Sequence, residues 1–107
     1  RSSVDKGQYF WSYTVVIINN GAETVQLRAR HWIITDATGR KQEVRGPGVV
    51  GEQPTLAPGE RFEYTSWTRL ATPQGTMRGT FFCMTEQAQP FEATIGEFML
   101  APPQALH

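Results

Sequence analysis

Residues 43–60 constrain the fold more than any other stretch of this sequence. They read EVRGPGVVGEQPTLAPGE, with glycine and proline at short intervals. Glycine adopts positive φ at little cost, whereas proline fixes φ and removes a hydrogen-bond donor. A run of this kind is typical of a shaped connection between strands, not of a slack linker. We therefore predict three strands before this connection and three strands after it.

The sequence before the connection has the two-residue alternation of β-strands. Residues 9–18 are rich in aromatic and β-branched side chains and predict the first strand. Residues 24–36 predict the second strand, but Val25 and Trp32 have opposite parity within it. Both can reach the core only if an extra residue shifts the alternation, so we expect a β-bulge near residues 29–30.

The remaining strands are shorter or more polar. Residues 40–45 are mostly polar and predict a short edge strand. Residues 61–68 alternate between apolar and charged side chains, and residues 77–83 place apolar or small side chains on one face. Residues 91–95 predict the last strand, which can continue past Gly96.

These strands predict an all-β fold, an immunoglobulin or fibronectin III-like β-sandwich of two antiparallel sheets. No apolar period of 3.6 residues extends over about ten residues or more, so no helix is expected. The 107 residues fit one domain, and the single cysteine, Cys83, excludes a disulfide-pinned immunoglobulin domain. Apolar neighbours predict that Cys83 is a buried, inert thiol. The inward parity predicts a core of Trp11, Tyr13, Val15, Ile17, Trp32, Ile34, Phe62, Tyr64, Met77 and Phe81.

The charged residues exclude few classes of partner. Ten basic and ten acidic residues cancel, so net charge favours neither a nucleic-acid nor a membrane partner. Basic residues outnumber acidic ones within residues 28–45, and a solvated strand face is the simplest interpretation of that imbalance. His31 has no second histidine or cysteine nearby, so no metal site is predicted. No apolar run approaches about 18 residues, and residues 1–6 lack the apolar region of a signal peptide.

The letters of residues 46–51, GPGVVG, match the dinucleotide-binding pattern G-x-G-x-x-G. That mechanism needs a helix N-terminus after the glycines, and prolines follow here instead, so a Rossmann site is not predicted. Two alternatives remain. The loop's N–H groups can form an anion nest beside Arg45, or the loop is a packed connection that presents Pro47 and Val49 to a partner. The candidate binding residues are Arg45, Gly46, Pro47, Gly48, Val49 and Gly51.

Read together, six segments resemble the ApaG family. They are WSYTVVIIN (11–19), RHWIITD (30–36), VRGPGVVGEQP (44–54), LAPGE (56–60), FEYTS (62–66) and TPQGTMRGTF (72–81). The resemblance covers about residues 7 to 101 and implies a fibronectin III-like β-sandwich. Family members usually carry a further strand before the segment equivalent to residues 7–9. The resemblance therefore implies that residues 1–107, a single ApaG-like domain, lack this N-terminal strand. Gly96 and Glu97 stand where the family commonly has two prolines, which leaves the register of the last strand open.

The resemblance also carries expectations about function. Bacterial family members are associated with cobalt resistance and magnesium efflux. Similar domains of F-box proteins and of a polymerase-delta-interacting protein act as protein-interaction modules. The resemblance therefore implies a non-enzymatic, cytoplasmic module with another protein as partner, and we expect no cofactor, metal, nucleic acid or membrane. The alternative is a phosphate-anion or nucleotide-binding domain that uses residues 46–51, which have been proposed as a nucleotide site in the family.

Overall fold

The computed structural model describes residues 8–100, which form seven β-strands in two antiparallel sheets. The predicted β-sandwich is therefore confirmed. Sequence reasoning missed one strand, the two-residue β4 inside the glycine and proline connection. The strands are β1 (Tyr9–Ile18), β2 (Val25–Asp36), β3 (Lys41–Pro47), β4 (Thr55–Leu56), β5 (Arg61–Leu70), β6 (Gly75–Thr85) and β7 (Pro90–Leu100).

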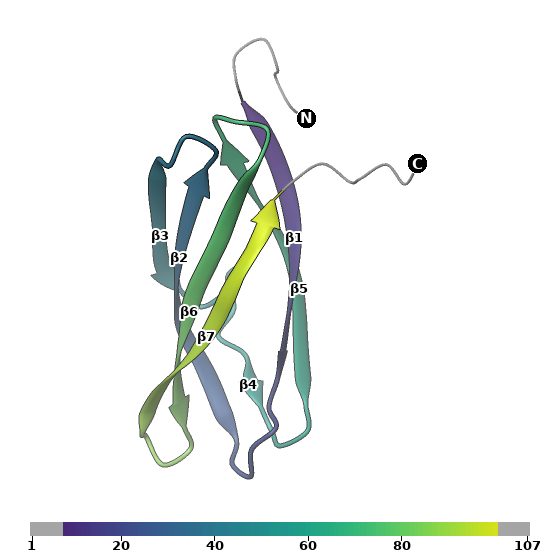
Figure 1. Cartoon of the computed structure of the whole chain (residues 1–107). Coiled ribbons are helices and arrows are strands. Elements are labelled where there is room, and N and C mark those ends of the chain that lie inside the picture. Colours follow the sequence, from purple (N-terminus) through teal and green to yellow (C-terminus); the bar gives the residue numbers. More distant parts are fainter. Residues whose placement is uncertain (1–7, 101–107) are drawn as a thin grey trace.

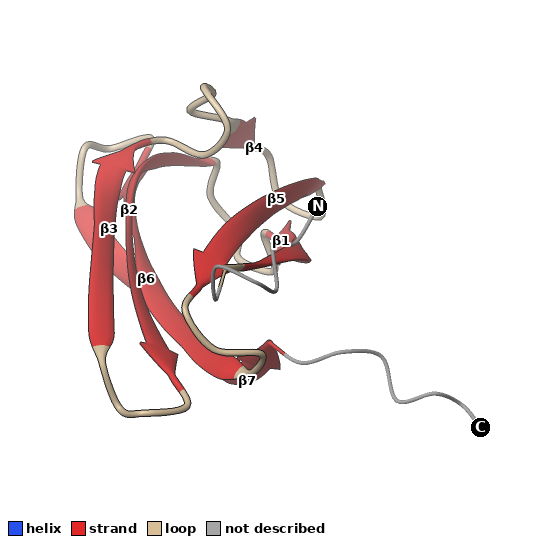
Figure 2. Ribbon diagram, turned by 90° about the horizontal axis from the view of Figure 1, so that it is seen from above, coloured by secondary structure: helices blue, strands red, loops and turns tan. Residues whose placement is uncertain are grey.

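The two sheets differ in size. One contains β1 and β5, and the other has the order β3-β2-β6-β7, with β4 paired to the start of β2. Figure 1 shows the two sheets side by side, with long strands running along the molecule. In Figure 2, seen along the strands, the larger sheet curves around the β1–β5 pair. The predicted edge strand β3 does lie at an edge of its sheet.

Two β-bulges set which side chains reach the core. In β2 the register shifts between Leu27 and Ala29, so Arg28 is the extra residue, slightly before the predicted place. The apolar side chains on both sides of the bulge consequently reach the core: Leu27 before it, and Trp32 and Ile34 after it. In β7 the register shifts within residues 95–98, and Leu100 is therefore buried. The last strand thus continues past Gly96. Its register, which the sequence left open, contains a bulge at this point.

The core surrounds Trp32, which is 2% exposed. The indole ring lies edge-on to the rings of Tyr13, Phe81 and Phe98 at 5.8–6.2 Å between centroids. Gly79 allows this packing, because a Cβ there would lie 2.5 Å from the indole ring. Five predicted core residues are buried: Trp32, Ile34, Tyr64, Met77 and Phe81. The other five are only half-buried: Trp11, Tyr13, Val15, Ile17 and Phe62.

The side of the sandwich between β1 and β7 is open. An apolar groove of about 430 Å³ lies there, lined by both strands and by Phe81. The inward side chains of Val15 and Ile17 border this groove and are partly exposed for that reason. Within residues 8–100, β1 pairs only with β5, so its other edge has the backbone groups that a third strand would need. That a family strand belongs at this edge stays a prediction.

The glycine and proline connection covers part of the opposite side, between β3 and β5 (Figure 2). The loop that follows β3 crosses this side to reach β4, which Figure 2 shows beside β5. Val49, within this loop, is fully buried and belongs to the core cluster. Among the described residues, no helix is long and apolar enough to cross a membrane.

Candidate functional site

The predicted site residues lie in a tight loop with a defined backbone. Val49 and Glu52 exchange two backbone hydrogen bonds, each of 2.8 Å. The two residues between them, Val50 and Gly51, have φ values of 41° and 82°. This is the backbone of a two-residue type I′ turn, which normally takes asparagine, aspartate or glycine. The loop tip is thus a small hairpin, and its shape is fixed by its own hydrogen bonds.

Arg30 fastens this hairpin to the larger sheet. Its Nη1 atom donates to the carbonyl oxygens of Pro47 at 3.0 Å and Gly48 at 2.9 Å. The guanidinium lies against Gly46, where a Cβ would be 3.0 Å from Nη1. Arg28 adds a second anchor, because its carbonyl oxygen accepts from the Gly48 amide at 2.7 Å. Sequence reasoning found the glycines but not the arginine that holds them.

The prediction that Val49 faces a partner is wrong. Val49 is 0% exposed, because its side chain fills the core beneath the loop. Val50, the next residue, is 50% exposed at the loop tip, and Pro47 is also exposed. Positive φ turns the backbone at Val50, which is why the outward side chain is shifted by one position. A β-branched residue with positive φ is an outlier that the surrounding structure must enforce.

The loop amides are not arranged as an anion nest. The amides of Gly48, Val49 and Glu52 all donate to carbonyl oxygens of the chain, and Pro47 has no N–H to donate. Gly46 lies opposite Arg30 in the β2–β3 pairing. An anion would have to compete with these carbonyl oxygens for three of the loop's amide donors. The geometry therefore favours a packed connection over a phosphate cradle.

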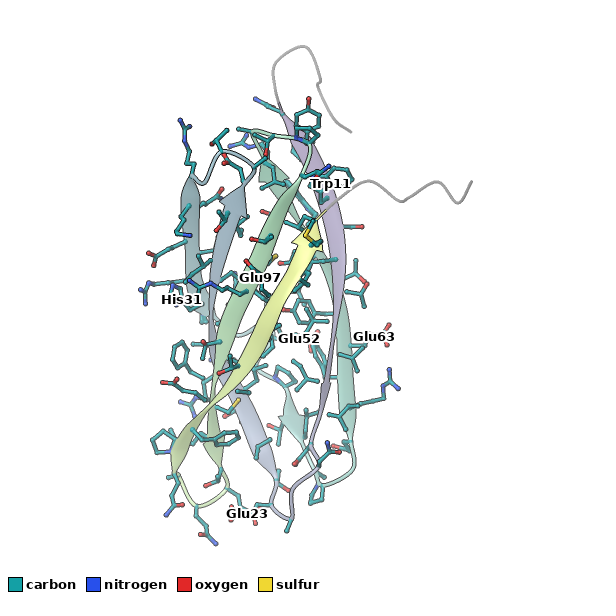
Figure 3. The ribbon with its side chains drawn as sticks, in the orientation of Figure 1. Trp11, Glu23, His31, Glu52, Glu63 and Glu97 are labelled. Carbon is teal, nitrogen blue, oxygen red and sulfur yellow. The ribbon has the colours of Figure 1, made fainter. Side chains whose placement is uncertain are left out.

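Arg45 belongs to a charge cluster on the outer surface of β2 and β3. Its Nη2 atom lies 3.2 Å from Glu43 Oε1, and His31 Nε2 lies 2.9 Å from the same oxygen. The hydrogen bond with His31 lowers the pKa of Glu43 most, and the hydrogen bond from Arg45 lowers it further. Figure 3 shows His31 on the side of the larger sheet that faces away from β1 and β5. Among residues 8–100, no three histidine, cysteine or acidic side chains gather as a metal site would require.

Cys83 is buried, as predicted. Desolvation raises the pKa of its thiol, so the reactive thiolate is disfavoured. The thiol therefore lacks the electropositive, accessible surroundings that a nucleophilic cysteine requires.

A cleft also lies between β3 and β5, and sequence reasoning did not identify it. It consists of two adjoining cavities of about 370 and 380 Å³ that share Gln42 and Arg69. Trp67 is 63% exposed at its rim, with its ring 5.5 Å from that of Phe10. The outward parity of Trp67 on its strand was a usable signal, because Phe62 and Tyr64 face inward.

Comparison with known proteins places this structure in a family. The sequence matches the family described as the ApaG domain over residues 1–85. It is 61% identical over 103 residues to Protein ApaG of Bradyrhizobium diazoefficiens, covering 96% of this chain and 79% of the relative. Protein ApaG of Rhodopseudomonas palustris is 62% identical over 104 residues, with 97% and 80% of the two chains covered.

A solved structure agrees with these matches. The crystal structure of an ApaA protein from Bordetella pertussis superposes with a TM-score of 0.93 at 57% identity. The superposition covers 97% of this chain and 85% of the other. The strong sequence matches and the shared fold point to the same conclusion. This chain belongs to the ApaG family.

Proposed function

We propose that this domain is a non-enzymatic module that binds another protein in the cytoplasm through what we call the β3–β5 face. The face comprises Pro47 and Val50 of the loop together with Trp67 beside the cleft. Under this proposal, the link of bacterial relatives to cobalt and magnesium runs through the partner protein, and the domain itself holds no metal.

The conformation of Val50 is the observation that carries the proposal. A valine with positive φ costs about 1–3 kcal/mol and persists only when neighbouring structure enforces it. Its side chain is half-exposed, so it contributes little to the core in return. Strained residues of this kind cluster at functional sites such as active sites, ligand clamps and switch regions. We therefore interpret Val50 as an apolar anchor that the loop displays.

The rigidity of the loop supports the same proposal. Arg30, the Val49–Glu52 hydrogen bonds and the buried Val49 side chain all fix the loop before any partner arrives. A preorganised loop loses less conformational entropy on binding than a mobile one. The phosphate-anion alternative lacks comparable support, because most of its amide donors are already paired and Arg45 contacts Glu43.

Site-specific photo-cross-linking tests this proposal. Val50 is replaced by the photoreactive residue benzoylphenylalanine in cells of a bacterium that produces the domain, and the cross-linked protein is identified by mass spectrometry. The matched control carries the same group at Gln87, an exposed residue of the turn between β6 and β7. We expect a discrete protein adduct from position 50 that position 87 does not give.

The captured protein must then bind the purified domain. We expect Val50→Asp to weaken this binding by about tenfold or more, which corresponds to about 1.4 kcal/mol. Gln87→Asp should leave the affinity unchanged. The proposal is wrong if both positions give the same adducts, or if Val50→Asp binds the captured protein as tightly as the unmodified domain.

A further inference from the structure

Three basic side chains, from the turn before β3, from β3 and from β5, line the cleft between β3 and β5. Arg40 ends the turn between β2 and β3, Lys41 is the first residue of β3, and Arg69 lies near the end of β5. None of the ion pairs found within residues 8–100 involves any of the three. The local excess of basic residues noticed in the sequence is mostly exposed to solvent, as predicted. Part of it is gathered at one cleft, where Arg69 joins it from across the sandwich.

Among residues 8–100, Asp36 is the one acidic side chain that lines this cleft. Its Oδ1 atom accepts hydrogen bonds from the amides of Thr38 and Arg40 and from the Thr38 hydroxyl, at 2.7–3.1 Å. These bonds, led by the one from the hydroxyl, lower the pKa of Asp36, so the carboxylate stays ionised. The Asp36 carboxylate therefore shapes the turn after β2 and offsets one of the three positive charges. The described residues that line the cleft therefore carry a net positive charge, which suits an anionic ligand.

An aromatic surface continues the cleft toward the loop. The second cavity is lined by Phe10, Val44 and Trp67, and it shares Arg69 and Gln42 with the first. Exposed tryptophan beside arginine is the combination that dominates binding energy in protein interfaces. The binding surface is therefore elongated, with a basic end and an aromatic end. Its basic groups are exposed side chains, not the convergent backbone amides that hold a phosphate.

We propose that this cleft takes an acidic segment of the partner protein, with carboxylates against the three basic residues and an apolar side chain against Trp67. This inference rests on the proposed function and specifies the chemistry of its partner. Charge complementarity selects the acidic segment and speeds its association. The aromatic surface supplies the buried apolar contact that a purely ionic, solvent-screened interaction lacks.

A peptide titration followed by NMR tests the inference. The probe is a capped peptide with a central phenylalanine and two glutamates on each side, and its matched control has glutamine at the four glutamate positions. We expect the acidic peptide to shift the amides of Lys41, Gln42 and Arg69 and the indole of Trp67. Raising the salt concentration from about 50 to about 300 mM should weaken the binding several-fold, because exposed charges are screened.

Charge variants identify the residues involved. Lys41→Gln and Arg69→Gln should each weaken the binding of the acidic peptide by about two- to tenfold, as expected for partly exposed ion pairs. Arg69→Lys, which retains the charge, should keep part of the affinity. The matched control is Arg61→Gln on the same strand, because Arg61 faces outward, pairs with Glu63 at 3.0 Å and lies outside the cleft. It should bind as the unmodified domain does.

Three results would overturn the inference: equal binding of the glutamine peptide, absence of shifts at these residues, or equal shifts with inorganic phosphate at the same ionic strength. The last result would make the cleft a general small-anion site. A negative peptide titration leaves the cross-link at Val50 intact, and then only the acidic preference is wrong. A missing cross-link at Val50 contradicts the protein-binding proposal itself, whatever the peptide does.

Discussion

Replacing Gly48 by alanine should destabilise the domain much more than the same replacement at Gly51. Both glycines have positive φ, 58° and 82°. A Cβ at Gly51 meets nothing within 4 Å, whereas a Cβ at Gly48 would lie 2.1 Å from the backbone oxygen of Glu52. The two variants therefore share the backbone strain and differ in one backbone collision.

The magnitudes follow from these contacts. Holding alanine at positive φ costs about 1–2 kcal/mol, of which about 0.4–1 kcal/mol is offset by the stiffer unfolded chain. Gly51→Ala should thus cost about 0.5–1 kcal/mol. Relieving the collision at Gly48 must open the Val49–Glu52 pair, whose two hydrogen bonds contribute about 1 kcal/mol each. With partial exposure of Val49 added, Gly48→Ala should cost about 3–5 kcal/mol.

Urea unfolding followed by tryptophan fluorescence measures both free energies. Gly59 supplies a matched control outside the hairpin, because its φ is 86° and a Cβ there also meets nothing within 4 Å. Gly59→Ala should behave like Gly51→Ala. If Gly48→Ala comes within about 1 kcal/mol of Gly51→Ala, the hairpin does not fix the loop as we infer.

Further predictions concern the loop anchor, the core and metals. Arg30→Met should lower the free energy of unfolding by about 1–3 kcal/mol, because two loop carbonyls lose their donor; urea unfolding measures this, and a loss below about 0.5 kcal/mol would contradict the anchoring role. Burial raises the pKa of Tyr64 above the 10.0 of a free tyrosine. The stability that its protonated form contributes is therefore complete below about pH 10 and is lost as the pH rises further. Tyr64→Phe removes a buried hydroxyl that has no hydrogen-bond partner among the described residues. At neutral pH, Tyr64→Phe should leave the free energy of unfolding unchanged or slightly higher. Above about pH 10, the free energy of unfolding should fall less steeply for the variant than for the unmodified domain. An equally steep fall in both proteins would refute this. Calorimetry with cobalt on the tag-free domain should show no stoichiometric binding, and saturable binding at micromolar concentration would overturn the metal-free account.

The sequence could predict which residues form strands and which side chains face the core, because both depend on a two-residue period. The β2 bulge could be predicted because Val25 and Trp32 have opposite parity yet are both apolar. The prediction located the bulge slightly too late, since parity reveals that an extra residue exists but not which one it is. For β7, the sequence left the register undetermined at Gly96 and did not predict the bulge that lies there.

The candidate site was harder to predict. The glycine pattern located the loop, but it did not reveal that Val50 has positive φ, and the outward side chain was assigned to Val49 instead of Val50. The role of Arg30 depends on a contact with residues about 17 positions further along the chain. The cleft could not be predicted at all, because Arg40 and Arg69 meet only once β3 and β5 face each other across the sandwich.

Hydroxyl-radical footprinting tests the central claim, that the β3–β5 face binds a protein, most directly. Trp67 on this face and Met99 on β7 are each 63% exposed, and both side chains are readily oxidised. Oxidation of the two residues is compared between the purified domain and the domain within bacterial lysate, each normalised to total labelling. We predict that lysate protects Trp67 several-fold and leaves Met99 unchanged. Equal oxidation of Trp67 in both conditions, or protection of Met99 alone, would contradict the account.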